Sequence, residues 1–282
     1  ESSAENKERF LKERMLFDIT LFSDDSKIQR KPKGHLYLYP LIAIAAMLAI
    51  VFVMDLPHMH KPKQQLSQTI RIPAGQRAQM DLPDGSVVWL NSQTTLTYDE
   101  DFGKKDRKVT LDGEAYFEVA HNKEIPFYVQ TENIKVQVTG TKFDVCSYKG
   151  SNSFIARLIE GSINLLTNSA KEEKTITRLT KGKYFSMENG KYRTGEMSSN
   201  NALAWMQGIY YFDDVPFKEL LDKIALYYNY KITVKNPKIL ENYRCTGKFK
   251  DLDGIEHILK VIQKDHPFKY DIDNEHNKIT IE

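Results

Sequence analysis

The sequence predicts a membrane-anchored chain of several domains: a cytoplasmic helix, one transmembrane helix, an all-β domain of solenoid-like or sandwich-like form, and a small α+β domain. Three observations predict this fold class. Residues 36–54 carry no charge, residues 68–198 alternate apolar and polar side chains, and residues 199–282 alternate strand and helix patterns. The expected segments are a tail, a membrane span, a periplasmic linker and two outer domains: 1–35, 36–54, 55–67, 68–198 and 199–282.

Composition excludes several classes of protein. The formal net charge is +2, so overall charge gives no reason to expect direct binding to nucleic acid. The two cysteines, Cys146 and Cys245, fall in different predicted domains and are expected to be unpaired thiols. The chain begins with Glu1 rather than Met, so we expect a fragment or a processed chain, with part of the N-terminus missing.

The tail is predicted to contain an amphipathic helix. Ser2 and Glu5 fit a capping box, and apolar residues recur after them at helical spacing. Because the tail has no domain of its own to pack on, its apolar face is expected to contact a partner or another copy of the chain. The alternative is one helix of a larger bundle. The contact candidates are Phe10, Leu11, Met15, Phe17, Ile19 and Phe22.

The run LYLYPLIAIAAMLAIVFVM at 36–54 is long enough to cross a bilayer as a helix. A cleaved signal peptide would have a shorter apolar core and a small-residue cleavage site, and a soluble core seldom contains so long an uncharged run. Basic residues are denser before the run than after it. The preceding residues are therefore expected to lie in the cytoplasm and the following ones outside.

Residues 68–198 are predicted to form successive strands, because apolar residues recur at every second position between turn residues. The stretch LPDGSVVWLN at 82–91 is typical: Pro83, Asp84 and Gly85 predict a tight turn, and a strand follows. No strict internal repeat chooses among a sandwich, a barrel and an irregular solenoid.

Residues 199–282 predict a strand, a helix and a strand, followed by a strand, a helix and two strands. The first helix, within DDVPFKELLDKIALYYN, is expected to have an Asp cap with Pro216 in its first turn. The second is expected within DLDGIEHILKVIQKD, and FKYDID and KITIE are expected to close the domain as a hairpin.

The chain shows no set of catalytic residues, so we expect no enzymatic activity, no cofactor and no metal site. The linker residues Asp55, His58 and His60 lack further ligands nearby. The acidic residues beside glycines are assigned to turn formation rather than to acid–base chemistry: Asp84, Asp112 and Glu114.

One dipeptide remains a candidate for covalent chemistry. Gly140–Thr141, in VQVTGTKFDV, lies between two predicted strands. A Thr hydroxyl can attack the preceding carbonyl if the peptide bond is strained, and a glycine before it lowers the steric barrier. The alternative is a plain β-turn.

Several stretches together resemble the FecR family of membrane-anchored anti-sigma regulators. They include GQRAQMDLPDGSVVWLNSQTTLTY, RKVTLDGEAYFEVAHNKEIPFYVQT, VQVTGTKFDV and ARLIEGSINLL. The stretches YYFDDVPFKELLDKIALYYNYKITV and YRCTGKFKDLDGIEHILKVI resemble the family's C-terminal domain, which is similar to the short domain of secretins and TonB-linked receptors. The resemblance covers nearly everything after residue 67.

The resemblance implies a single-pass protein of the inner membrane with its C-terminal domains in the periplasm. Its tail would hold an extracytoplasmic-function sigma factor, and its outer part would contact the periplasmic signalling domain of a TonB-dependent outer-membrane transporter. An intramembrane protease would release the tail, and uptake genes for a glycan or iron would be transcribed. Some relatives cut themselves at a Gly–Thr bond, and Gly140–Thr141 falls on that motif. The alternative function is a membrane-tethered periplasmic binding or assembly module with no sigma-factor role.

Overall fold

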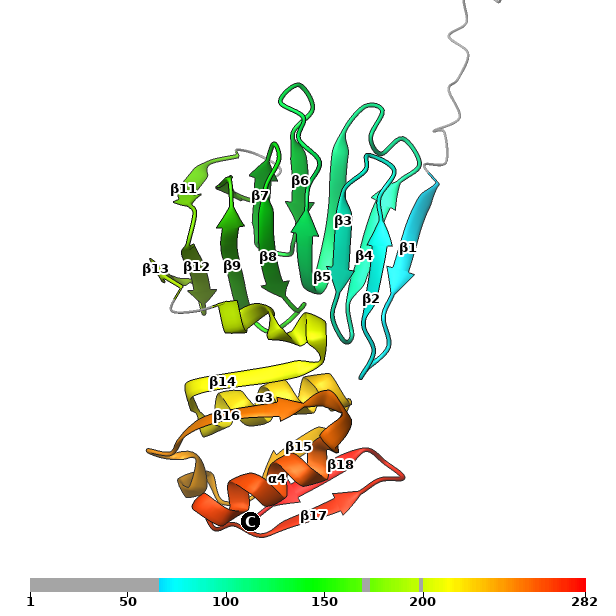
Figure 1. Ribbon diagram of the computed structural model, residues 1–282. Helices are drawn as coiled ribbons and strands as arrows, with labels where there is room; N and C mark the ends of the chain where they lie inside the picture. Colours follow the sequence, from blue (N-terminus) through cyan, green and yellow to red (C-terminus); the bar gives the residue numbers. More distant parts are fainter. Residues whose placement is uncertain (1–65, 169–172, 198–199) are drawn as a thin grey trace, which may run out of the picture. The chain divides into compact units, whose positions relative to one another are not determined.

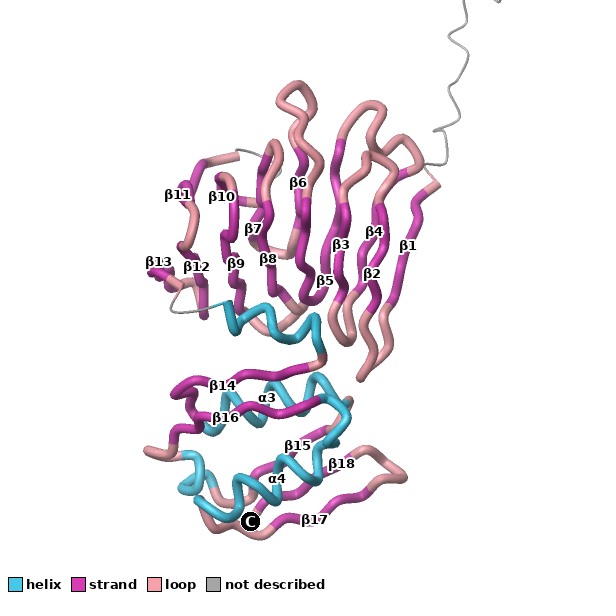
Figure 2. Tube along the Cα trace, viewed as in Figure 1, coloured by secondary structure: helices cyan, strands magenta, loops and turns pink. Residues whose placement is uncertain are grey.

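The computed structural model describes residues 66–168, 173–197 and 200–282 of the chain. A large β part is followed along the chain by a small part that contains both strands and helices (Figures 1 and 2). This order confirms the predicted all-β and α+β parts. The predicted tail, the membrane span and residues 55–65 of the predicted linker lie outside the described residues, whereas Ser67, expected in the linker, is the first residue of β1.

One hydrogen-bonded sheet of 13 strands folds over into two layers that share the long strand β5, Arg107–Glu118. Sheet I uses the first half of β5, and its order is β1–β4–β5–β6–β7–β10–β11. Only β5 and β6 run parallel in it. Its other strands are β1 Ser67–Arg71, β4 Thr95–Asp99, β6 Phe127–Gln130, β7 Ile134–Val138, β10 Ser162–Thr167 and β11 Thr175–Thr180.

Sheet II uses the second half of β5 and is antiparallel throughout, in the order β2–β3–β5–β8–β9–β12–β13. Its other strands are β2 Ala78–Asp81, β3 Val87–Leu90, β8 Lys142–Ser147, β9 Ser153–Glu160, β12 Lys183–Glu188 and β13 Lys191–Glu196. The open, half-barrel arrangement of the two layers agrees with the sandwich or barrel alternative rather than with a solenoid of repeated turns (Figure 1).

Gly113 marks the point at which β5 passes from one layer to the other. Its φ is +133°, and a Cβ placed there would lie 2.6 Å from the Cα of Thr94. The Thr94 hydroxyl accepts a hydrogen bond from the Glu114 N–H at 3.0 Å, which fixes the two backbones against each other. Only glycine leaves room for this approach.

The apolar side chains that alternate along the strands fill the space between the two sheets. Sheet I contributes residues such as Leu96 and Val109, and sheet II contributes residues such as Val88 and Val145, all fully buried. The apolar positions of the alternation predicted from the sequence therefore form the inward face of each layer.

The turn predicted at Pro83–Gly85 forms, and it is also anchored to the core. The Leu82 N–H donates to the Ser86 carbonyl at 2.8 Å, and the Asp84 carboxylate accepts from the N–H and hydroxyl of Ser86. Asp84 also accepts from Nη1 of Arg107 at 3.2 Å, and both side chains are nearly inaccessible to solvent. Three of the other four N–H donors of this buried guanidinium bond to backbone carbonyls, which offsets much of its desolvation: Ala120, Asn122 and Ile125.

The C-terminal part contains a two-stranded sheet and a three-stranded sheet, with two helices between them (Figure 2). The pair is β14 Ile209–Pro216 with β16 Arg244–Lys250, and the triplet is β15 Lys231–Val234, β18 Lys278–Ile281 and β17 Tyr270–Asp273. The helices are α3 Phe217–Tyr228 and α4 Gly254–Asp265, and the short 3₁₀ segments are η1 Asn200–Gln207, η2 Pro237–Leu240 and η3 Asp251–Asp253.

The predicted Asp cap of the first helix is wrong. Pro216 occupies the N-cap of α3 with no side-chain hydrogen bond, and β14 continues through Asp213 and Asp214. Asp214 adopts a φ of +47° and interrupts the register with β16, because its N–H bonds the Thr246 hydroxyl. The two acidic residues therefore belong to a β-bulge.

None of the helices in the described part of the chain is both long and apolar enough to span a membrane. The predicted span at 36–54 is outside that part.

Replacing Gly113 by alanine is expected to lower the free energy of unfolding by about 3 kcal/mol or more, because the new Cβ collides with the Thr94 backbone. Gly190→Ala is the matched control. Gly190 also has positive φ, at +77°, but an added Cβ would meet no atom within 4 Å. Its cost should be about 1 kcal/mol. Urea denaturation of both variants measures the difference, and equal losses would contradict the steric account.

Candidate functional site

The structure places Gly140–Thr141 in the connection between β7 and β8. A Cβ on Gly140 would lie 2.4 Å from Nδ1 of His121, so the imidazole packs directly against this glycine. Thr141 is buried, and its hydroxyl donates to the Ser162 carbonyl at 3.2 Å. The sequence analysis did not identify His121, whose imidazole lies close to the candidate bond.

The six apolar residues proposed for sigma-factor contact lie outside the described residues, as do Asp55, His58 and His60. Within the described ranges, no group of three or more His, Cys, Asp or Glu side chains is placed to hold a metal ion.

A different site emerges on the outer face of sheet II, which points away from the core between the sheets. Hydrogen-bonded register aligns one row of side chains across five neighbouring strands: Trp89, Tyr116, Asp144, Arg157 and Tyr184. Glu114 and Cys146 form a second pair one row along. These residues alternate along their strands with residues that point into the core, and strand pairing brings them side by side on one surface.

Arg157 is the centre of a buried charge cluster on this face. Its Nη1 lies 2.5 Å from Asp144 Oδ2 and 3.7 Å from Glu114 Oε1. Asn91 Nδ2 donates to the other oxygen of Glu114 at 2.6 Å. Two carboxylates thus share one guanidinium. The expectation that Glu114 serves a turn is wrong, because Glu114 is a buried residue in the middle of β5.

Burial controls the protonation of this cluster. It raises the pKa of Asp144 to about 7, although the Arg157 guanidinium opposes the shift and the Glu114 carboxylate adds to it. The indole N–H of Trp205 lies close enough to lower that pKa slightly, but neither Trp205 Nε1 nor Asp144 Oδ1 reaches normal hydrogen-bond geometry with any described residue. Burial also raises the pKa of the Cys146 thiol well above its usual value, so the thiol is neutral at physiological pH.

Trp205 belongs to η1, the segment that leads from the β part into β14. It is buried in a second apolar cluster that joins the C-terminal part to the outer face of sheet II. From sheet II this cluster includes Tyr116, with Trp89 and Ile159 packed at its side. The outer face is therefore covered by the chain that follows it.

The C-terminal end of α3 is capped by the β part. The last carbonyls of a helix have no partner inside the helix. Here the Tyr227 carbonyl accepts from the Gly75 N–H at 3.0 Å and from the Ser92 hydroxyl at 3.1 Å. The side-chain amide of Gln93 donates to the Leu226 carbonyl. Two loops of the β part thus complete a helix of the C-terminal part.

A partly buried ion pair adds a second connection. Arg77 Nη2 lies 2.7 Å from Asp251 Oδ2, and both side chains are largely buried. Tyr210 donates to the other carboxylate oxygen of Asp251 at 3.3 Å, and Tyr228 donates to its carbonyl at 3.1 Å. Tyr210 also stacks on Tyr227 with ring centroids 4.2 Å apart. Tyr210, Tyr227 and Tyr228 are therefore part of the junction.

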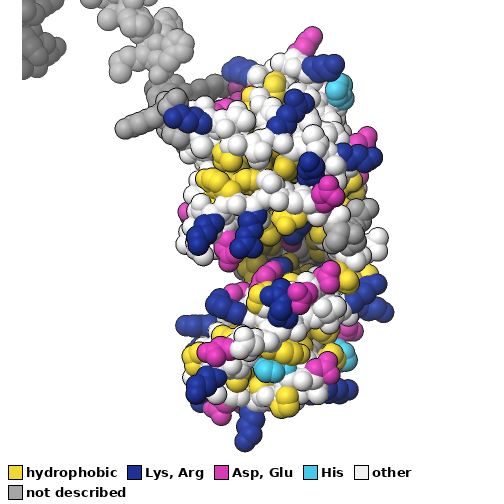
Figure 3. Space-filling model, turned by 90° about the vertical axis from the view of Figure 1, so that its left-hand side faces the viewer, with side chains coloured by type: hydrophobic (Ala, Val, Ile, Leu, Met, Phe, Trp, Pro, Cys, Tyr) yellow, Lys and Arg dark blue, Asp and Glu magenta, His cyan; other side chains and the backbone are white. Residues whose placement is uncertain are grey.

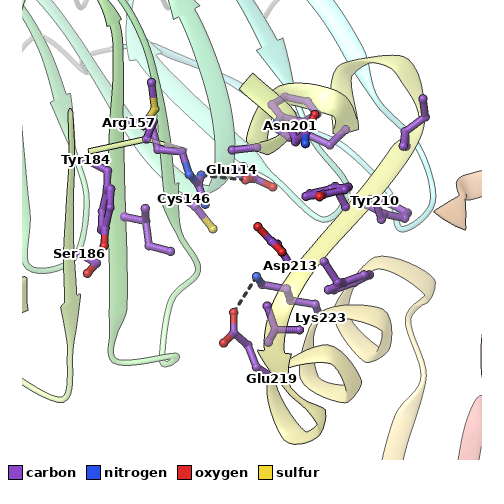
Figure 4. Close-up of a pocket in the computed structure, with 18 of the residues that line it drawn as sticks. Glu114, Cys146, Arg157, Tyr184, Ser186, Asn201, Tyr210, Asp213, Glu219 and Lys223 are labelled. Atoms are coloured by element: carbon purple, nitrogen blue, oxygen red, sulfur yellow. Dashed lines mark hydrogen bonds and ion pairs between the residues drawn. The ribbon is translucent and has the colours of Figure 1, made fainter. Parts of the chain in front are cut away.

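The cover over sheet II leaves a half-open cavity of about 500 Å³ beside the charge cluster. Figure 3 shows a recess on this side of the molecule, with apolar side chains inside it and charged side chains at its rim. In Figure 4, Arg157, Glu114 and Cys146 face the cavity from sheet II, while Asp213 and Lys223 face it from β14 and α3.

Relative to an Asp144→Asn variant, the wild-type chain is expected to lose stability as pH rises from about 4 to about 7. The folded-state pKa of Asp144 lies above its unfolded value, so the folded state binds the proton more tightly and gains stability only while the carboxyl is protonated. Urea unfolding of both proteins at several pH values measures the difference. A stability difference that does not change across this range would contradict the assignment.

The described fold matches known proteins along most of its length. The FecR protein family matches residues 68–164, and the FecR C-terminal family matches residues 209–281. No curated protein is significantly similar to the chain. Two crystal structures of a candidate anti-sigma factor from Parabacteroides distasonis share 25% identity with it, with TM-scores of 0.65 and 0.66. They cover 77% and 76% of this chain, and 98% of their own. From these matches, in the order that the β and α+β parts follow along the chain, we conclude that the chain belongs to the FecR family of anti-sigma factors.

Proposed function

We propose that the chain is a single-pass anti-sigma factor of the inner membrane, with residues 36–54 as the span and the two C-terminal parts in the periplasm. The main support is the succession of the FecR and FecR C-terminal matches over the described β and α+β parts. The uncharged run at 36–54 and its basic N-terminal flank support the topology. The cytoplasmic tail then holds an extracytoplasmic-function sigma factor.

The outer part receives its signal by contact with the periplasmic signalling domain of a TonB-dependent transporter. The capped end of α3 and the Arg77–Asp251 pair support this proposal, because they connect the C-terminal part firmly to the β part. A partner that binds one part and displaces it then also changes the position of the other part. Proteolysis at the membrane releases the tail with its sigma factor, and uptake genes for a glycan or iron are transcribed.

Replacing Phe10, Phe17 and Phe22 together by serine is expected to abolish co-purification of a sigma factor with the affinity-tagged full chain, because these side chains supply much of the tail's apolar face. Lys12→Ser, on a charged position of the same segment, is the matched control and should retain the partner. Mass spectrometry identifies the protein that co-purifies. A wild-type chain that recovers no sigma factor would favour the membrane-tethered binding or assembly module.

Self-cleavage at Gly140–Thr141 is a separate part of the proposal. The Thr141 hydroxyl attacks the Gly140 carbonyl carbon, the peptide nitrogen takes a proton and leaves as an amine, and water then hydrolyses the resulting ester. His121, which packs against Gly140, is our candidate acceptor of the hydroxyl proton. Its position supports the idea, whereas the bond from Thr141 to the Ser162 carbonyl must first be released.

Expression of the full chain is expected to give two fragments of nearly equal length, the second beginning with Thr141. Thr141→Ala should give one intact band, and Thr141→Ser should still be cut because it keeps the nucleophile. Thr139→Ala is the nearby control and should be cut like the wild type. N-terminal sequencing of the smaller bands checks the bond. An intact wild-type band, indistinguishable from that of Thr141→Ala, would eliminate self-cleavage without affecting the sigma-factor role.

A further inference from the structure

The cavity beside the charge cluster runs along the backbone of β14. Five consecutive residues, 209–213, line it. Because successive side chains of a strand point to opposite faces, a cavity touched by all five must follow the edge of the strand. β14 pairs with β16 on its other side and with no further strand in the described structure.

The hydrogen-bond pattern indicates which groups are available on that edge. The Asp251 N–H donates to the Gly208 carbonyl at 2.8 Å, which continues the β14–β16 ladder by one residue pair. In an antiparallel ladder, bonded and non-bonded pairs alternate. Tyr210 and Phe212 therefore bond to β16, and Ile209 and Tyr211 direct their N–H and carbonyl groups toward the cavity.

The lining selects for positive charge. It contains four carboxylates, Glu114, Glu196, Asp213 and Glu219, against two cations, Arg157 and Lys223. Arg157 is already bound by Asp144 and Glu114, and Lys223 pairs with Glu219 at 2.8 Å. Within the described residues, neither Asp213 nor Glu196 forms an ion pair. Their two negative charges therefore leave the groove acidic.

Aromatic side chains provide the remaining contact surface. Tyr184, Tyr210, Tyr211, Trp205 and Tyr227 all line the cavity. Such rings bind the apolar stems of lysine and arginine and attract their charged ends. A volume of about 500 Å³ is also within the range of sites that enclose small ligands or short peptide segments.

We propose that this groove binds an extended, basic peptide segment of a partner protein, which adds as a strand to the free edge of β14. The backbone groups of Ile209 and Tyr211 hold the peptide main chain, and Asp213 and Glu196 attract its basic side chains. The inference rests on the cavity and the strand edge alone, so it is independent of the sigma-factor role of the tail.

The test measures fluorescence anisotropy of a labelled peptide, TVKVKVT, added to the full chain. Its controls are the acidic peptide TVEVEVT and a TVKVKVT peptide methylated at alternate backbone nitrogens. The basic peptide is expected to bind about tenfold more tightly than the acidic one, and more weakly as salt rises. Methylation should weaken binding about tenfold as well, because it removes the main-chain donors of one edge.

Two variants of one residue locate the site. Tyr211→Pro removes an outward N–H without breaking a bond to β16, and should weaken binding about tenfold. Tyr211→Ala loses the same ring but keeps the N–H, so it should bind more tightly than Tyr211→Pro, and the difference between the two variants isolates the backbone donor. Asp213→Asn should reduce the preference for the basic peptide. Circular dichroism verifies that each variant is folded.

The outcomes separate the proposal from its alternatives. Equal binding of the methylated peptide would show electrostatic adhesion alone and overturn it. Failure of the basic peptide to bind at millimolar concentration would overturn it as well. If ultracentrifugation shows that the unliganded chain dimerises, and that Tyr211→Pro abolishes the dimer, the occupant is a second copy of the chain rather than a basic peptide of a partner.

Discussion

The charge cluster of Arg157, Asp144 and Glu114 is the constraint around which the described part of this chain is arranged. A guanidinium with two carboxylates cannot be sealed under an apolar layer without a desolvation cost of several kcal/mol per ion. The buried Trp205 lies beside Asp144 of the cluster, while Arg157 keeps part of its surface at a half-open cavity. The cavity is therefore a consequence of placing charge on the outer face of a sheet that another part of the chain must cover.

The C-terminal part is also bound to the β part by direct contacts, so it is not an independent module joined by a linker alone. At the end of α3, the Tyr227 carbonyl receives its donors from Gly75 and Ser92 of the β part, and the Leu226 carbonyl accepts from Gln93 as well as from Asn229 in its own part. Separating the two parts would leave these carbonyls to water and expose the apolar cluster under Trp205. The β part thus supplies hydrogen bonds to the end of the helix, and a contact that displaces one part must break them. For a regulator whose two parts have to communicate, these contacts provide a physical route.

The sequence predicted what depends on local patterns and missed what depends on strand register. Alternation along β5, β8 and β9 identified the inward residues, since each strand shows it independently. Arg157, in FIARLIE, had the ordinary appearance of an outward, solvated residue. Its partners Asp144 and Glu114 are on other strands, and only the pairing of β5 with β8 and of β8 with β9 brings the three together. The Asp cap failed for a related reason, because the bond from Asp214 to Thr246 is set by the neighbouring strand rather than by the helix.

The free edge of β14 is the feature that the folding of this chain does not account for. Edge strands in soluble proteins are usually shortened, charged or covered, because unpaired backbone groups invite another strand. The bulge at Asp214 protects the far end of β14 in this manner, and the stretch before it has no such protection. Tyr211 is also exposed there, although large apolar side chains are otherwise mostly buried in the described residues. Because this unpaired strand edge lies inside an acidic recess, few strands of other proteins can reach it and pair with it nonspecifically. It remains available to a segment that is narrow, extended and basic, which is why the geometry of the recess and its charge indicate the same kind of partner.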